Sequence, residues 1–145
     1  VVAMILWSRH SDKTNERTWH VALACITAAI GLVIAAGTGS VIGLIAALTI
    51  VNVGISCSKP PLWSMPTMFL SGAAAATGIA TINSIGNLGG FAGPAMIGWV
   101  KDQTGSFTGG LYFVAGLLIL STVITLVLSF TQKKDKVSAA ELSNS

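Results

Sequence analysis

The fold class of this chain follows from one stretch, Ile82-Asn83-Ser84-Ile85-Gly86-Asn87-Leu88-Gly89-Gly90-Phe91-Ala92-Gly93-Pro94, which places two asparagines and four glycines inside an apolar run. No carboxylate accompanies them, because the chain has no Asp or Glu between Glu16 and Asp102. Small and polar residues in a long uncharged region are typical of helices that pack inside a membrane and line a solvated path. The stretch therefore predicts an all-α membrane protein.

Composition extends this prediction to the whole chain. Apolar residues make up 52% of the 145 residues, charged residues only 9%, and the mean hydropathy is +0.78. Because typical soluble domains carry roughly 25% charged residues, a packed soluble core cannot absorb this much apolar surface. We therefore expect a lipid bilayer as the surrounding partner and no nucleic acid.

Four segments are long enough to cross a bilayer, whose core of about 30 Å needs about 20 apolar residues per helix. Within residues 19–132 they lie at about 19–37, 41–63, 71–99 and 111–130. Residues 1–7 are too short to span, so we interpret them as the end of a preceding transmembrane helix, with a native start at Met4 as the alternative. A loop is expected at 8–18 and a Lys-rich tail at 133–145.

Charge in the connections predicts the orientation. The turn at 37–40 carries no basic residue and the polar turn at 101–106 carries one. The first loop and the tail hold most of the basic residues, namely Arg9, Lys13, Arg17, Lys133, Lys134 and Lys136. By the positive-inside rule, the first loop and the C-terminus are cytoplasmic and both short turns face outward.

The glycines of the opening stretch form two small-xxx-small pairs, Gly86 with Gly90 and Gly89 with Gly93. Such pairs let helix backbones approach closely in a membrane. Pro94 lacks an amide hydrogen, so a kink is expected near it. A helix that rocks against its neighbours and an ordinary tightly packed helix both fit this pattern.

Asn83 and Asn87 lie four residues apart and share one helix face with Gly90 and Pro94. An amide facing lipid would leave its donors and acceptors unsatisfied. The two side chains must therefore face protein or water. They either hydrogen-bond a neighbouring helix as structural contacts or meet hydroxyl and carboxylate groups of a substrate.

Lys59 and Trp63 are the other notable polar positions. Lys59 is the only formal charge inside the expected spans. It either lies near the cytoplasmic end of its helix and extends to the interface, or contacts an anion in a cavity if the helix continues to Phe69. Trp63 is either an interfacial anchor or a cavity wall, and its indole N–H needs a partner in both cases.

Cysteine and histidine residues give no metal-binding pattern. Cys25 and Cys57 fall in apolar segments and are interpreted as buried thiols. His10 and His20 have no ligand spacing around them. We therefore predict no metal site, no cofactor, no catalytic residues and no enzyme activity.

Three stretches carry a resemblance to a known family. The first is Trp7–Arg17, which resembles the loop motif G-R-x-S-D-R-x-G-x-R, and the second is Leu62–Gly72, which resembles F-W-x-L-P-x-x-F-L-x-G. The third is Gly78–Gly93, with the asparagines and glycines of the opening stretch. Together they resemble the C-terminal part of a major facilitator superfamily transporter, more narrowly the anion:cation symporter family, from the end of helix 8 to helix 12.

The resemblance implies a twelve-helix fold in a bacterial inner membrane, whose N-terminal helices are missing here. It also implies proton-coupled uptake of an organic anion by alternating access, the anion being a sugar acid, a dicarboxylate such as tartrate or an aromatic acid. Asp12, Arg17 and Arg9 match gating-loop positions. Substrate contacts are expected at Trp63, Asn83, Asn87 and Lys59.

Two other kinds of protein fit the same spans. One is a stand-alone small four-helix membrane protein such as a channel or assembly factor. The other is an inactive truncated remnant. Translation of the coding sequence upstream of Val1 separates them, because further apolar spans in frame favour the transporter.

Overall fold

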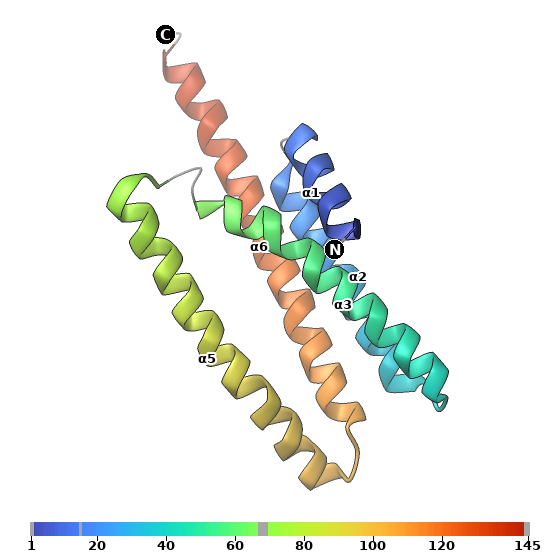
Figure 1. Ribbon diagram of the computed structural model, residues 1–145. Helices are drawn as coiled ribbons and strands as arrows, with labels where there is room; N and C mark the ends of the chain where they lie inside the picture. Colours follow the sequence, from blue (N-terminus) through green and yellow to red (C-terminus); the bar gives the residue numbers. More distant parts are fainter. Residues whose placement is uncertain (1, 15, 67–69, 144–145) are drawn as a thin grey trace.

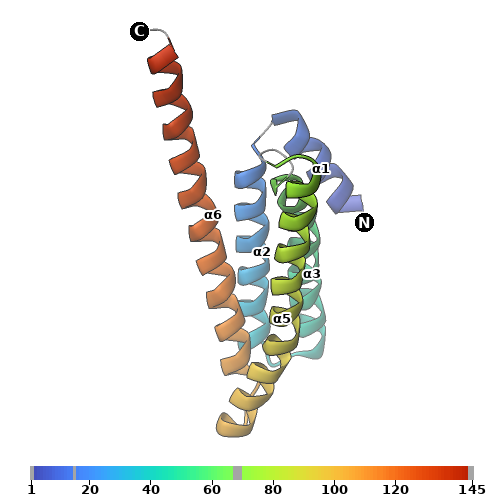
Figure 2. The same ribbon diagram turned by 90° about the vertical axis from the view of Figure 1, so that its left-hand side faces the viewer.

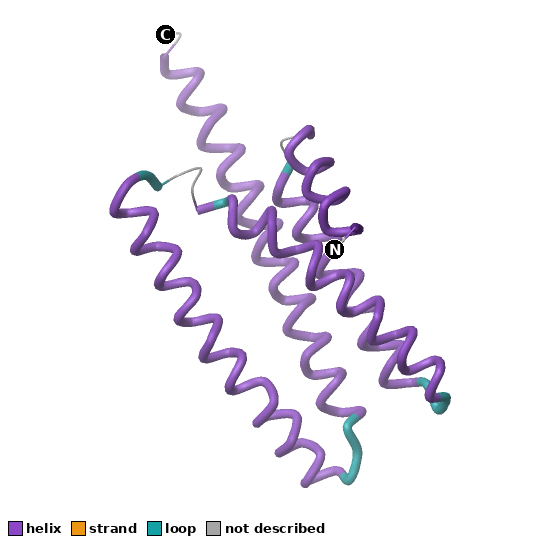
Figure 3. Tube along the Cα trace, in the orientation of Figure 1, coloured by secondary structure: helices purple, strands orange, loops and turns teal. Residues whose placement is uncertain are grey.

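Helices make up nearly the whole computed structural model, which describes residues 2–14, 16–66 and 70–143, with side chains described up to Thr131. Short turns join α2 to α3 and α5 to α6 (Figure 3). The element order is α1 Val2–Thr14, α2 Arg17–Gly37, α3 Val41–Ser64, α5 Gly72–Thr104 and α6 Thr108–Ser143.

Three helices are long and apolar enough to cross a membrane, namely α2, α3 and the part of α6 from Thr108 to Thr131. The span expected at 71–99 lies within α5, which is not among them. Its glycines, asparagines and hydroxyl side chains lower its hydropathy, although its 33 residues exceed the length required. Membrane crossing by α5 stays a prediction.

Helix α2 forms the centre of the bundle, with α3 and α6 packed against it (Figure 1). The core cluster joins Ala28 and Leu32 of α2 to Val51 of α3 and Ala115 of α6. Alanine is the commonest residue among the buried apolar positions, so the helix backbones lie close together around a few larger side chains such as Leu32.

Two glycines permit the close contact of α2 and α3. A Cβ atom at Gly54 would lie 2.7 Å from both the Ala24 carbonyl oxygen and the Ala28 amide nitrogen. At Gly31 it would lie 2.8 Å from Cγ2 of Val51. Backbone of one helix therefore occupies the space that a side chain of the other would need.

Helix α5 makes its main contacts with α6 and none of its residues is buried. The two helices meet at the turn that joins them and run apart from there (Figure 2). A Cβ atom at any of Gly86, Gly89, Gly90 and Gly93 would meet nothing within 4 Å. Within the described residues, the expected small-xxx-small packing therefore has no partner.

Helix boundaries differ from the sequence-based expectations in three places. Residues 8–14, expected in a loop, are the second half of α1, where the Thr14 hydroxyl donates to the His10 carbonyl at 3.0 Å. The turn expected at 101–106 is shorter, because α5 continues to Thr104. Its end is set by Gly105, whose left-handed φ of 69° suits glycine. The tail expected at 133–145 is helical up to Ser143.

Candidate functional site

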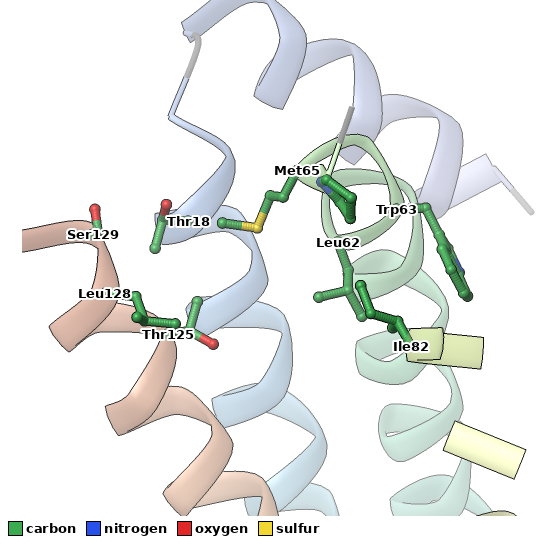
Figure 4. A pocket seen from close by; sticks show the side chains of 9 residues that line it. Thr18, Leu62, Trp63, Met65, Ile82, Thr125, Leu128 and Ser129 are labelled. Atoms are coloured by element: carbon green, nitrogen blue, oxygen red, sulfur yellow. The ribbon is translucent and has the colours of Figure 1, made fainter. Parts of the chain in front are cut away.

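A pocket opens at the end of the bundle where α2 begins and α3 ends. Its cavity volume is about 250 Å³. The second half of α6 forms the opposite wall, and α5 contributes Ile82 (Figure 4). The lining residues are Thr18, Leu62, Trp63, Met65, Pro66, Ile82, Thr125, Leu128 and Ser129.

The end of α3 determines the shape of this pocket. Pro60 and Pro61 lie inside the helix, yet α3 continues to Ser64. The Ser64 hydroxyl donates to the Pro61 carbonyl at 2.9 Å, which satisfies an acceptor near the helix end. The helix then ends, and Met65 points its side chain towards Thr18 across the cavity (Figure 4).

Trp63 lines the pocket, as one of its two sequence-based interpretations required. Its side chain is 38% exposed, and its indole N–H has no hydrogen-bond partner among the described residues. Ile82 of α5 lies beside Leu62 in the same lining (Figure 4). The pocket therefore offers an aromatic wall whose indole N–H is a hydrogen-bond donor.

Asn83, Asn87 and Lys59 do not line this pocket. All three are exposed, and none makes a hydrogen bond or ion pair within the described part of the chain. Lys59 lies little more than one turn before the end of α3 at Ser64. The continuation of that helix to Phe69 falls outside the described residues. Asn83 follows Ile82 directly, so its side chain starts beside the pocket and points along another face of α5.

Arg17 joins the helix ends next to the pocket. Its Nη1 donates to the Ser64 carbonyl at 3.2 Å, and its Nη2 lies 3.7 Å from Oδ1 of Asp12. Asp12 belongs to α1 and Ser64 to α3, so one guanidinium holds three helices together. The ion pair is open to solvent on the Asp12 side, where the side chain is 62% exposed.

Of the three expected gating residues, the structure thus brings Asp12 and Arg17 together. Arg9 is exposed and makes no hydrogen bond or ion pair with the described residues. Ser11 lies between Arg9 and Asp12 in the sequence. It is 1% exposed, and its hydroxyl has no partner in the described structure. Helix α1 therefore lies close against α2 and α3 at this end of the bundle.

Sequence reasoning missed the hydroxyl groups of the pocket. Thr18 follows Arg17, and Thr125 and Ser129 lie one turn apart in Thr108–Thr131, the most apolar of the three candidate spans. That spacing puts both hydroxyl groups on one face of α6. The spacing is visible in the sequence and could have predicted a polar face there. With Trp63 the hydroxyl groups of the pocket supply donors and acceptors around an apolar cavity, an arrangement that suits binding of a small polar molecule without covalent chemistry.

Three curated relatives show what the chain resembles. A protein of Agrobacterium vitis named as a tartrate transporter is 74% identical over 134 residues, which are 92% of this chain and 30% of that protein. The quinolone resistance transporter of Acinetobacter baumannii is 31% identical over 98% of this chain and 33% of its own length. The inner membrane transport protein RhmT of Escherichia coli (strain K12) is 35% identical over 83% of this chain and 28% of its own length.

The chain thus spans about a third of the length of the curated relatives it matches. No protein-family model and no solved structure matches it. All three relatives are named for transport, and the helices described above are those of a membrane protein.

Proposed function

We propose that this chain, which is similar to named transporters over most of its length, is part of a major facilitator superfamily carrier that imports an organic anion with protons. One observation supports the substrate class, namely the 74% identity over 92% of this chain to a protein named for tartrate transport. The proposed substrate is therefore a small hydroxylated dicarboxylate such as tartrate, in preference to a sugar acid or an aromatic acid.

In this proposal, the helices of this chain form one wall of the substrate path. Proton coupling needs a titratable group inside the membrane, commonly a carboxylate. Because the chain has none between Glu16 and Asp102, the proposal places that carboxylate on further helices of the same carrier. The relatives, of which this chain spans about a third, are long enough to supply them.

Alternating access in this proposal depends on the contacts around Arg17. When the cytoplasmic side is closed, Arg17 holds Asp12 and the end of α3, with Arg9 close by in sequence. Opening breaks the ion pair to Asp12, which is weak because it is solvent-exposed. Trp63, Asn83, Asn87 and Lys59 then contact the substrate.

Uptake by the complete carrier is expected to be coupled to protons. Addition of tartrate to weakly buffered cells that express it should make the medium more alkaline as substrate enters. The measurement is external pH together with uptake of labelled tartrate. Uptake without any pH change would contradict symport, and the absence of tartrate uptake would contradict the substrate.

Substitutions within the same assay test the proposed contacts. Asn83→Ala and Lys59→Ala should each raise KM about tenfold, because a hydrogen bond to a charged group contributes about 1.5–3 kcal/mol. Asn52→Ala is the matched control. That amide accepts a hydrogen bond from the Ser56 hydroxyl within its own helix at 3.3 Å, away from the pocket. Unchanged KM in the first two variants would remove these residues from the site.

The proposed location is the bacterial inner membrane, with the C-terminus in the cytoplasm. The two outward turns carry one basic residue between them, whereas the first loop and the tail carry most of the Lys and Arg residues, and this difference supports the orientation. A thiol introduced by Gly39→Cys, in the turn between α2 and α3, is expected to react with a membrane-impermeant maleimide in intact spheroplasts. Reaction only in inside-out vesicles would reverse the orientation.

A further inference from the structure

Two histidines join α1 to α2 beside the Arg17 contacts. His10 Nδ1 lies 2.8 Å from His20 Nε2, and the ring centroids are 5.1 Å apart. Trp7 covers the same site, with its indole N–H donating to the His20 carbonyl at 3.2 Å. His20 is only 6% exposed, whereas His10 is open to solvent.

The second ring nitrogen of His20 determines how the pair is protonated. Its Nδ1 lies 2.7 Å from the Glu16 carbonyl oxygen. A carbonyl oxygen only accepts hydrogen bonds, so this Nδ1 must carry a proton. In a neutral His20 the Nε2 is then a lone-pair acceptor, and His10 Nδ1 must donate to it.

The contact tolerates one added proton and not two. If His10 takes up a proton at its exposed Nε2, its Nδ1 still donates to His20 and the bond becomes charge-assisted. If both rings are protonated, Nδ1 of His10 and Nε2 of His20 are both donors. Two N–H groups then face each other 2.8 Å apart and two like charges meet at a buried site, so the rings must separate.

Charged side chains lie near the histidine pair, but within the described structure they do not take part in its hydrogen bonding. The described side chains of α6 carry no charge. Charges of both signs lie on the helices that meet here, namely Arg9, Asp12 and Lys13 on α1, Glu16 and Arg17 on α2, and Lys59 on α3. None of their side chains hydrogen-bonds either imidazole within the described structure. The pair therefore responds to pH through its own two rings.

We propose that the His10–His20 pair is a proton-controlled latch that holds α1 against α2 and opens when both imidazoles are charged. It rests on the proposed function in one respect, since the latch lies beside the Asp12–Arg17 contact assigned to the gate. His20 follows Arg17 by three residues on the same face of α2, and His10 and Asp12 share the last turns of α1. Separation of the rings moves Asp12 away from Arg17.

The test measures the position of α1 in the complete carrier in lipid nanodiscs, without substrate. Nitroxide labels are placed by Lys13→Cys, near the end of α1, and Gly39→Cys, in the turn after α2, with other thiols including Cys25 and Cys57 replaced. The labels are separated by about the length of α2, on the order of 30 Å. Pulsed dipolar spectroscopy then gives the distance distribution at pH 8 and at pH 5, the range in which imidazoles gain protons.

The parent is expected to shift to longer or broader distances at pH 5. His10→Gln should keep the pH 8 distance at both pH values, because an amide can donate to a neutral His20 and accept from a charged one. His10→Ala should show the open distribution at both. A parent without a shift, or a His10→Gln variant that shifts like the parent, overturns the latch. Because no substrate is present, an error in the proposed substrate or coupling leaves this result unchanged.

Discussion

Gly54→Leu is expected to prevent the packing of α2 and α3 and to abolish accumulation of folded protein in the membrane. A Cβ atom alone would lie 2.7 Å from backbone atoms of Ala24 and Ala28. Backbone cannot rotate away as a flexible side chain can, so the two helices must separate. Since overpacking commonly costs about 1–3 kcal/mol in soluble cores, a leucine here should exceed that range.

Gly54→Ala and Gly37→Ala form the matched pair for this prediction. Gly37 also lies in a helix, but an added Cβ there would meet nothing within 4 Å. Gly54→Ala should lower the unfolding midpoint of the detergent-solubilised protein, measured by thermal aggregation, whereas Gly37→Ala should leave it unchanged or raise it. Equal midpoints for both variants would show that α2 and α3 are not in close backbone contact.

Arg17→Gln is expected to lower the maximal uptake rate at least about tenfold while leaving the amount of protein in the membrane unchanged. The substitution replaces the charged guanidinium that donates to the Ser64 carbonyl at the end of α3 with a shorter, neutral amide. A hydrogen bond from a charged donor contributes about 1.5–3 kcal/mol, and about 1.4 kcal/mol corresponds to a factor of ten in rate. Arg17→Lys should recover only part of the rate, because lysine lacks the planar fork that reaches two partners.

Asp12→Asn should have a much smaller effect than Arg17→Gln. The Asp12 side chain is 62% exposed and its oxygen is 3.7 Å from the guanidinium. Exposed pairs of this kind contribute about 0–1 kcal/mol. Uptake rates of the two single variants and the double variant give the coupling between them. An Asp12→Asn loss as large as that of Arg17→Gln would show that the ion pair, and not the Ser64 contact, holds the gate.

Several features of the fold were readable from the sequence because each depends on local composition. Trp19 to Gly37 is apolar over the length of a bilayer, and the structure has α2 there. Gly37 to Ser40 was recognisable as a turn, and Ser40 indeed accepts from the Gly43 amide as the helix N-cap. The helical extension of α1 to Thr14 was missed, because its charged and hydroxyl residues resemble a loop, although the Thr14 hydroxyl donates back to the His10 carbonyl of the same helix.

The candidate site was only partly readable. Asp12 and Arg17 were each selected as gating-loop residues through a family motif, and they lie at ion-pair distance. The Ser64 carbonyl was not foreseen, because a backbone oxygen carries no sequence signal. Thr18 was overlooked as an ordinary helix residue. Assignment of Asn83, Asn87 and Lys59 to substrate stays a prediction, since none of them lines the described pocket.

By itself, the sequence determined that this chain is helical and lies in a membrane, and it located most of the helix ends. The reason is that a segment surrounded by lipid must satisfy its backbone hydrogen bonds within its own helix, so length and apolarity suffice. Only the tertiary structure decided that α2 is central, that Arg17 reaches Ser64 and that His10 meets His20. Helices that are apolar on every side carry no pattern that distinguishes the face in contact with protein from the face in contact with lipid.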